Sequence, residues 1–292
     1  MKTLVIKTGS LGDVVRTTVV LNQLREDEVH WVTGNGAANL LPRGAVSRVY
    51  DYRNPEPALF STEFDRVLSL EESEACLKIL HRIKAKRIIG VYHTGQGVGY
   101  TPETSYWFDM SLSSRHGREE ADKRKKANRK TVPEILVGML GGTFNGQEYD
   151  IGVLPNDNPL IDVGLIDVCG KEWPNKTWPK YHELSARLES DGLRVATLPY
   201  RHSLQDHIQD VNNCSMVVSG DTLGMHLALA LKKKTVTLFT CTPPWEIEGY
   251  GRMRKIVSPR YEEAFMKRGH NPEVAGAISV DEVYSAVKDY LK

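Results

Sequence analysis

Short apolar runs alternate along the chain with segments whose apolar residues recur every three or four positions. Strands bury short continuous runs, whereas helices bury one stripe, so the alternation predicts strands separated by helices. This order is typical of an α/β protein with a mostly parallel, right-handed, doubly wound sheet. In the first half, strands are predicted at 3–7, 29–33, 47–52, 66–70 and 87–92, and helices at 13–24 and 72–86.

The second half repeats the alternation after a break. Residues 153–159 contain two prolines and several turn formers, which predicts a domain boundary there. We assign 1–153 to an N-terminal domain, 154–275 to a C-terminal domain and 276–292 to a closing helix. Strands are predicted at 161–168, 193–198, 216–219 and 235–239, and helices after Pro179 and at 204–212, 222–232 and 280–291.

Two neighbouring segments of the first half do not fit the alternation. Residues 94–114 are rich in glycine and aromatic side chains, and they are long for a plain connection, which favours a functional loop. Residues 119–140 predict a single helix that is basic in its first half and apolar in its second.

A glycine-bearing turn follows a buried strand in each half. Gly9, Ser10 and Gly12 lie in the first turn, and Gly224 lies in the second, at the start of the helix at 222–232. A helix N-terminus offers unpaired N–H groups and the positive end of the helix dipole, so it suits phosphates and carboxylates. The first turn fits either a tight connection or a phosphate cradle.

Asp13 closes the first turn, at the start of the predicted helix. It fits an N-cap or first-turn acid, which stabilises a helix by about 1 kcal/mol. It also fits a general base that takes a proton from an alcohol. The two roles can coexist.

Polar residues also follow two strands of the second half. Lys176 and Thr177 follow the first of them, and Asp221, Thr222 and His226 follow a later one. Open α/β sheets bind ligands at the carboxyl ends of their strands. A lysine there can neutralise a diphosphate and a threonine can donate a hydrogen bond to it. Each residue taken alone also fits a solvated or structural role.

Charge is distributed unevenly along the 292 residues. The chain carries a net +1, but residues 115–130 hold eight Lys and Arg against three Asp and Glu, so this segment carries +5 and the rest −4. The segment fits either a solvated helix face or a site for an anionic acceptor. Nucleic acid is not expected as a partner, because the chain as a whole is nearly neutral. The acceptor candidates are Trp107, Lys123, Arg124, Lys125 and Lys126.

Composition narrows the class of protein. No apolar run is long enough to span a bilayer, and no export signal is expected at the N-terminus. The four cysteines form no CxxC pair, so neither a disulfide framework nor a zinc site is predicted. We therefore expect a cytoplasmic globular protein without a metal site.

Five motifs occur in an order that resembles glycosyltransferase family 9, the heptosyltransferases that build the inner core of bacterial lipopolysaccharide. Their residues lie at 7–14, 176–179, 221–228, 239–244 and 249–251. The similarity touches nearly the whole chain. One departure is Leu223, which stands where the family usually has glycine, with Gly224 one residue later.

The resemblance implies the GT-B architecture, in which two Rossmann-like domains face each other across a cleft. It implies an inverting, metal-independent transfer of a sugar, heptose from ADP-heptose, to a hydroxyl of a glycan or other acceptor, without a cofactor. The N-terminal domain would take the acceptor, the C-terminal domain the nucleotide sugar, and the closing helix would pack back toward the N-terminal domain. By this resemblance, Asp13 matches the catalytic base of the family. Lys176 matches its phosphate-contacting lysine, and Thr177 lies beside it. The residues that match its donor-binding loop are Asp221, Thr222, Gly224 and His226.

Two other functions stay open at this stage. A sugar-nucleotide epimerase can have the same two-domain architecture, and a non-catalytic member would bind nucleotide sugars or an anionic partner without transferring a sugar. The acceptor is expected to be an anionic or lipid-linked glycan, with the protein free in the cytoplasm or peripheral at the inner face of the membrane.

Overall fold

The computed structural model describes residues 1–94, 97–111 and 114–291, which form two compact units, Met1–Gly152 and Val153–Lys292. Parts of the segment expected as a long loop at 94–114, namely 95–96 and 112–113, lie outside the described residues, as does the last residue of the closing segment 276–292.

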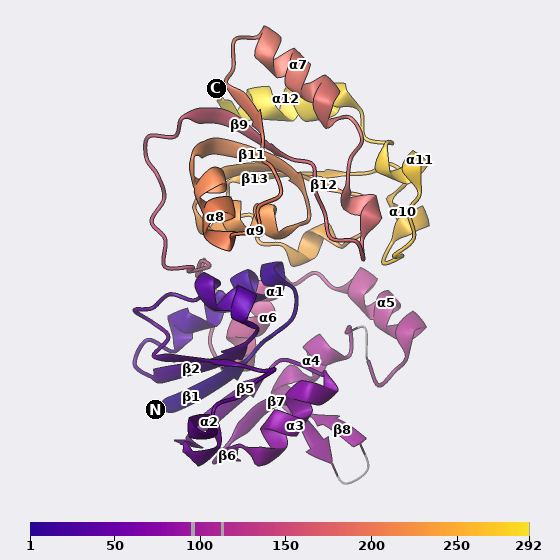
Figure 1. The fold of residues 1–292 in the computed structure, drawn as a ribbon. Coiled ribbons are helices and arrows are strands. Elements are labelled where there is room, and N and C mark those ends of the chain that lie inside the picture. Colours follow the sequence, from indigo (N-terminus) through magenta and orange to yellow (C-terminus); the bar gives the residue numbers. More distant parts are fainter. Residues whose placement is uncertain (95–96, 112–113, 292) are drawn as a thin grey trace. The chain divides into compact units, whose positions relative to one another are not determined.

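The first unit contains a sheet of the order β3-β2-β1-β5-β7-β8 (Figure 1). Its strands are parallel except β8, which pairs with β7 in the antiparallel direction. β2 and β3 lie on one side of β1, and β5, β7 and β8 lie on the other. The direction in which successive strands are placed therefore reverses at β1. The strands are β1 (Lys2–Ile6), β2 (Glu28–Thr33), β3 (Arg48–Asp51), β5 (Arg66–Ser69), β7 (Ile88–Thr94) and β8 (Gly97–Tyr100), and the short β4 (Glu63–Phe64) pairs with β6 (Lys84–Ala85).

Helical segments of the first unit cover both faces of this sheet. Leu4, Ile6 and Val32 point to one face, where they pack with apolar side chains of α2 and α3. On the other side α1, η1 and α6 pack together. The segments are α1 (Leu11–Thr17), η1 (Thr18–Gln23), η2 (Asn35–Leu40), α2 (Pro57–Ser61), α3 (Glu74–Arg82), η3 (Pro102–Thr104), α4 (Ser105–Phe108), α5 (Arg118–Ala127) and α6 (Val132–Met139).

The segment 119–140 forms two helices, where the sequence predicts one. Thr131 and Glu134 form a capping box that starts α6, and each side chain accepts a hydrogen bond from the other's backbone. Pro133 lies in the first turn, where its missing N–H is tolerated, whereas in a continuous helix it would break the hydrogen-bond ladder. The preceding segment 94–114 also differs from the expected loop, because its described residues include β8, η3 and α4.

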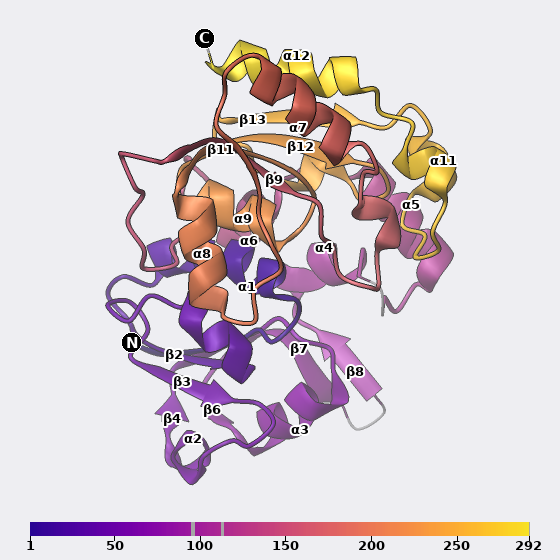
Figure 2. The same cartoon turned by 45° about the horizontal axis from the view of Figure 1, so that its top comes forward.

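The second unit has a wholly parallel sheet of the order β10-β9-β11-β12-β13. Figure 2 shows α7 and α12 side by side on one face of this sheet. The helices α8 and α9 pack against each other and against β11. The strands are β9 (Ile161–Ile166), β10 (Val195–Thr197), β11 (Cys214–Gly220), β12 (Lys234–Phe239) and β13 (Met253–Val257); the helical segments are η4 (Pro174–Lys176), α7 (Tyr181–Ser190), α8 (Leu204–Asn212), α9 (Leu223–Ala230), η5 (Pro244–Glu246), α10 (Tyr261–Ala264), α11 (Pro272–Ala275) and α12 (Val280–Leu291).

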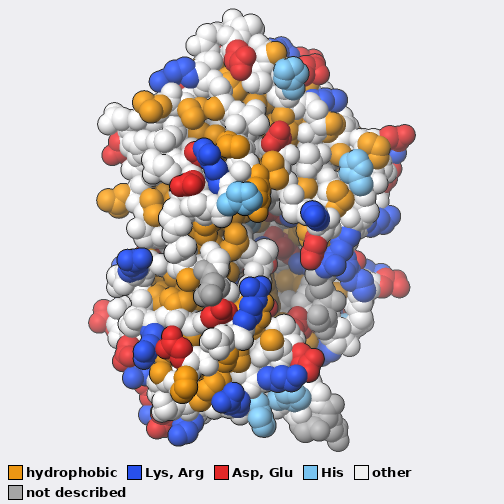
Figure 3. Space-filling view, in the orientation of Figure 1, with side chains coloured by type: hydrophobic (Ala, Val, Ile, Leu, Met, Phe, Trp, Pro, Cys, Tyr) orange, Lys and Arg blue, Asp and Glu red, His pale blue; other side chains and the backbone are white. Residues whose placement is uncertain are grey.

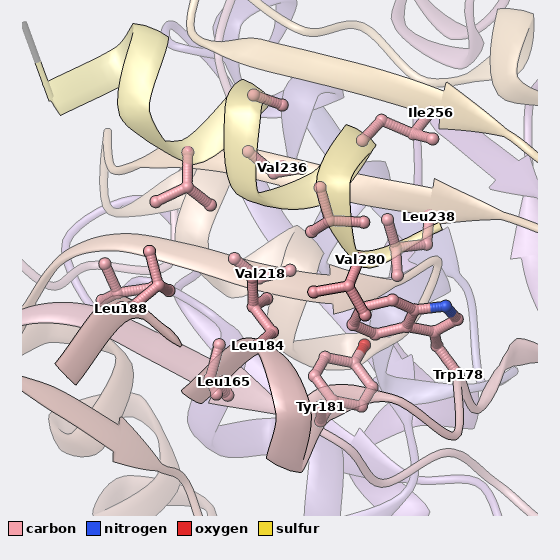
Figure 4. Packing of buried hydrophobic residues seen from close by; sticks show 14 of the residues in the cluster. Leu165, Trp178, Tyr181, Leu184, Leu188, Val218, Val236, Leu238, Ile256 and Val280 are labelled. Carbon is pink, nitrogen blue, oxygen red and sulfur yellow. The ribbon is translucent and has the colours of Figure 1, made fainter. Parts of the chain in front are cut away.

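The C-terminal helix α12 contributes its apolar stripe to the core of the second unit. Val280, Val283 and Val287 recur at helical spacing and are buried against α7 and the sheet. Figure 4 shows Val280 close to Trp178 and Tyr181, with Leu184 farther along α7. The side of α12 that carries these valines packs against α7 and β12 of the second unit. That the closing helix also packs back toward the N-terminal domain stays a prediction.

The fold class predicted from the sequence is confirmed. Each unit has a mostly parallel sheet flanked by helices, and in each the order of the strands reverses next to its first strand. Within the described residues, no helix combines the length and apolar character needed to cross a membrane.

Candidate functional site

The second unit brings polar residues from three neighbouring strands to one edge of its sheet. The strands β9, β11 and β12 are adjacent and parallel, so their carboxyl ends meet there. Lys176 follows β9 at the end of η4, Asp221 follows β11 directly, and Thr242 follows β12. The strand order reverses between β10 and β11, and ligands of open α/β folds bind at such a switch point.

Asp221 is the centre of a hydrogen-bonded network at this edge. Lys176 Nζ donates to Asp221 Oδ2 at 2.8 Å and to the Asp221 carbonyl oxygen at 2.7 Å. Thr242 Oγ1 donates to the same Oδ2 at 2.7 Å, and His226 Nε2 lies 3.6 Å from Oδ1. Burial by itself would raise the pKa of the Asp221 carboxyl, but the Lys176 ammonium, His226 and the two side-chain hydrogen bonds hold it well below its usual value. A fixed carboxylate therefore orients the lysine.

Helix α9 starts beside this network with an unused hydroxyl. Thr222 is the N-cap residue, with φ −130° and ψ 177°, but its side chain caps no N–H of the helix. The Thr222 hydroxyl oxygen is buried and has no hydrogen-bond partner among the described residues. Buried polar atoms normally have partners, and a helix start attracts anions. The geometry thus offers a hydroxyl and a positive dipole end to an anionic ligand.

Two glycines allow the backbone at this edge to pack closely. A Cβ atom on Gly220 would lie 2.3 Å from the carbonyl oxygen of Lys176, and one on Gly224 would lie 2.2 Å from Ile166 Cδ1. Gly220 therefore lets η4 approach the end of β11, and Gly224 lets α9 approach β9. Gly224 is buried at the start of α9, and its place in the donor loop stays a prediction.

Different contacts hold Lys176 and Thr177 in the loop before α7. Lys176 Nζ lies 5.6 Å from the centre of the Trp173 ring, which is a cation–π distance. Thr177 Oγ1 and Cys169 Sγ lie 2.8 Å apart and share a hydrogen bond. The lysine is therefore directed toward Asp221, whereas the adjacent threonine is engaged with the cysteine.

Thr242 lies in the motif at 239–244 but is not among the site residues predicted from the sequence. Its hydroxyl supplies one of the two side-chain hydrogen bonds to Asp221 Oδ2. The signal available in the sequence was its place just after a predicted strand that neighbours β11, where the carboxyl ends of parallel strands meet.

Asp13 lies at the corresponding edge of the first unit, after β1. Ser10, not Asp13, is the N-cap of α1: the Asp13 N–H donates to Ser10 Oγ at 3.4 Å. Asp13 is a first-turn acid whose Oδ1 lies 2.6 Å from Arg16 Nη2, and its side chain remains 30% exposed. The N-cap position of α1 is therefore filled by Ser10, and Asp13 lies in the first turn.

The first turn holds a carboxylate of its own chain. Glu71 Oε1 accepts hydrogen bonds from Lys7 Nζ at 2.7 Å, from the Thr8 N–H at 3.0 Å and from the Gly9 N–H at 2.7 Å. Of the two interpretations of this turn, a tight connection or a phosphate cradle, the described arrangement matches the first, since these two amides already have an acceptor. Glu71 was not among the residues predicted from the sequence, although it directly follows the strand predicted at 66–70, which pairs with β1 in the structure.

The acceptor candidates of the first unit lie on two helices. The guanidinium carbon of Arg16 lies 5.6 Å from the centre of the Trp107 ring on α4. Arg16 also pairs with Asp13, so it contacts both the aromatic segment and the proposed base. On α5, Lys123 pairs with Glu119 at 2.8 Å and Arg124 with Glu120 at 2.9 Å. In Figure 3 basic and acidic side chains adjoin each other where Figure 1 places α5.

Among the residues that the structure describes, no three His, Cys, Asp or Glu side chains group together as a metal site would require.

Comparisons with known proteins agree with the motifs. Residues 195–274 match the family model of glycosyltransferase family 9 (heptosyltransferase). Lipopolysaccharide heptosyltransferase 1 of Escherichia coli strain K12 is 24% identical over 299 aligned positions, which cover 88% of this chain and 93% of that protein.

Solved structures extend the similarity to the fold. The E. coli heptosyltransferase WaaC with ADP has a TM-score of 0.68 and 18% identity, with 99% of this chain and all of that chain covered. The E. coli ADP-heptose lipopolysaccharide heptosyltransferase II has a TM-score of 0.64 and 16% identity, with both chains fully covered. The fold is that of the GT-B heptosyltransferases.

The fold class is therefore that of the GT-B heptosyltransferase structures. The resemblance to glycosyltransferase family 9 is confirmed, and this chain is similar to the heptosyltransferases of that family.

Proposed function

We propose that this protein is an inverting, metal-independent glycosyltransferase that moves a heptose from ADP-heptose to a hydroxyl of an anionic glycan in lipopolysaccharide biosynthesis. The observation that carries the proposal is the arrangement of Lys176, Asp221 and Thr222 at the start of α9. The relatives support the donor, because one solved heptosyltransferase contains ADP and another ADP-2-deoxy-2-fluoro heptose.

The second unit, with residues 154–275 as the nucleotide-sugar domain, would bind the donor. The Lys176 ammonium neutralises the diphosphate, and the buried Thr222 hydroxyl gains the hydrogen-bond partner that it lacks in the free protein. The dipole of α9 adds positive potential at the same place. Thr177 and His226 are assigned to the same donor site, next to Lys176 and Asp221.

The first unit, with residues 1–153 as the acceptor domain, would supply the base. Asp13 takes the proton of the acceptor hydroxyl, whose oxygen then forms a bond to the anomeric carbon from the side opposite the diphosphate. The bond between that carbon and the diphosphate oxygen breaks, and the nucleotide diphosphate leaves with the electron pair. Lys176 and α9 stabilise the charge that develops there, so cationic groups of the chain do the work that a metal does elsewhere.

The basic helix α5 and Trp107 are proposed to bind the acceptor. Anionic glycans suit lysine and arginine clusters beside an aromatic ring, and Lys125 and Lys126 add to Lys123 and Arg124 on α5. A lipid-linked acceptor would place the protein at the inner face of the membrane, in the cytoplasm. Gly9, Ser10 and Gly12 would shape the turn that presents Asp13.

A nucleotide panel tests the donor assignment. Thermal unfolding is followed with ADP, UDP, GDP, CMP and NAD at equal millimolar concentrations, and a ligand at about 100 times its Kd adds about 2.7 kcal/mol of stability. We expect ADP to raise the midpoint of unfolding, and the lysine variant Lys176→Met to lose most of that rise. A higher midpoint of unfolding with UDP or GDP but not with ADP would contradict the assignment of ADP-heptose as the donor.

A further inference from the structure

Three charged side chains meet above Gly9 in the first unit. A methyl group built on the Gly9 Cα would lie 3.1 Å from Glu71 Oε1, 3.1 Å from Lys7 Nζ and 3.2 Å from Asp13 Oδ2. The carboxylate of Asp13 therefore faces the same small space as the Lys7–Glu71 ion pair. Glycine leaves this space open, because any larger residue would put a carbon atom among the three charges.

The ion pair itself is held rigidly. Lys7 Nζ and Glu71 Oε1 are 2.7 Å apart, and their side chains are only 10% and 13% exposed. Ile6 and Ser69 are paired on the neighbouring strands β1 and β5, so Lys7 and Glu71 both follow the carboxyl ends of adjacent strands. The N–H groups of Thr8 and Gly9 also donate to Glu71 Oε1, which ties the glutamate to the turn before Asp13.

The other charged groups around Asp13 come from its own helix and its neighbours. Arg16, one turn later on α1, contacts Asp13 Oδ1 at 2.6 Å. The segments η1 and η2, which pack against α1, contain no charged residue. On α6, which also packs against α1, the charged residue is Glu134, and its side chain accepts from the Thr131 N–H. Lys7 and Glu71 thus place two opposite charges beside the Asp13 carboxylate, across the space above Gly9.

We propose that Glu71 is a positioning residue that neutralises Lys7 and thereby keeps the Asp13 carboxylate basic enough to accept a proton. Without Glu71, the Lys7 ammonium would face Asp13 as an uncompensated cation and would favour its ionised form. Without Lys7, the negative charge of Glu71 would favour the protonated form of Asp13, because a nearby like charge disfavours ionisation. This inference rests on the proposed function, in which Asp13 is the base, but it concerns how that base is tuned.

The test is a titration of Asp13 that does not depend on catalysis. The side-chain carboxyl of Asp13 is followed by NMR in protein labelled with carbon-13 at aspartate, and the signal is assigned as the one lost in Asp13→Asn. Glu71→Gln retains an oxygen that can accept from the Thr8 and Gly9 N–H groups, so the turn is expected to persist. Thermal unfolding of each variant checks that it folds.

We expect the pKa of Asp13 to fall by about one unit in Glu71→Gln and to rise by about one unit in Lys7→Met, relative to the unsubstituted protein. The double variant, in which the pair is again neutral, should return the pKa to within a few tenths of the starting value. A general positional disturbance would not shift the pKa in opposite directions. Equal pKa values in all variants, or shifts of the same sign, would overturn the inference.

The kinetic consequence separates this inference from the proposed function. If Asp13 is the base, the acid limb of the pH profile of kcat/KM should move with the NMR pKa in both variants. If the NMR shifts occur but Asp13→Asn transfers sugar at the normal rate, the tuning is right and the catalytic role is wrong. If Asp13→Asn is inactive and the NMR pKa does not move, the catalytic role stands and the tuning is wrong.

Discussion

The ammonium of Lys176 is bound twice by one residue, through the side-chain oxygen and the carbonyl oxygen of Asp221, at 2.8 and 2.7 Å. A lysine held in this way has little freedom left to lose when a ligand arrives. Preorganised charge of this kind is more effective than a mobile side chain, because no binding energy is spent on orienting it.

Removing the Lys176 charge should weaken nucleotide binding. A charge-assisted hydrogen bond is worth about 1.5–3 kcal/mol, so Lys176→Met is expected to raise the Kd for ADP about 10- to 100-fold in calorimetry. The double variant Lys176→Met with Asp221→Asn avoids leaving a buried unpaired carboxylate and should show the same loss. Lys171→Met, at an exposed lysine of the same loop, is the control and should bind ADP normally. Normal affinity in both Lys176 variants would contradict the assignment.

The unused Thr222 hydroxyl permits a test without a loss of stability. Because Thr222 Oγ1 has no partner among the described residues, Thr222→Val should leave the free energy of unfolding unchanged or slightly increased. The same change should raise the Kd for ADP about tenfold, since the hydroxyl is proposed to meet a phosphate. Thr235→Val is a matched control, because its hydroxyl on β12 is also buried without a described partner. Equal ADP affinities in the two variants would argue against the phosphate contact.

The low pKa of Asp221 predicts acid sensitivity of the second unit. The pKa of the Asp221 carboxyl lies below the usual value of an aspartate in the folded state, so the unfolded state binds more protons in acid. The stabilisation is therefore present above about pH 4 and is lost as the pH falls below it. Urea unfolding at a series of pH values should show a smaller acid dependence in Asp221→Asn than in the unsubstituted protein. The same loss of stability in acid for Asp221→Asn and the unsubstituted protein would refute the prediction. Asp157→Asn, at an exposed aspartate, serves as the control.

The core between α7 and α12 should be sensitive to truncation. Leu184 is fully buried in the cluster of the second unit, so Leu184→Ala is expected to lower the free energy of unfolding by about 2–5 kcal/mol. The fluorescence of Trp178, which lies in the same cluster, can report the transition in urea. Leu160→Ala, at a residue 68% exposed, should change stability by less than about 0.5 kcal/mol. Similar losses in both variants would contradict this packing.

Much of the fold could be predicted because its strands are buried on both faces. The runs that became β1, β5 and β11 are continuous in apolar residues, and this pattern needs no knowledge of neighbours. β13, Met253–Val257, was missed because Arg254 and Lys255 interrupt its apolar character. The division between α5 and α6 was missed because it depends on the capping box at Thr131.

The candidate site was predictable only in part. Lys176 and Asp221 could be placed at one sheet edge, because both follow parallel strands. Their direct pairing depends on Gly220, which lets η4 approach β11, and no spacing in the sequence reveals that approach. Glu71 was overlooked for a related reason: its three donors belong to a turn more than 60 residues earlier, brought near by the pairing of β1 with β5.

The most direct test of the proposed function is the rate at which the protein transfers heptose from ADP-heptose to an anionic inner-core glycan, compared with Asp13→Asn. General base catalysis contributes about 10²- to 10⁴-fold, so the variant should lose at least about 100-fold in kcat while its Kd for ADP stays unchanged. Asp65→Asn, at an acid paired with Lys86 elsewhere in the first unit, should transfer normally. Near-normal transfer by Asp13→Asn, or no transfer from ADP-heptose by the unsubstituted protein, would contradict the account.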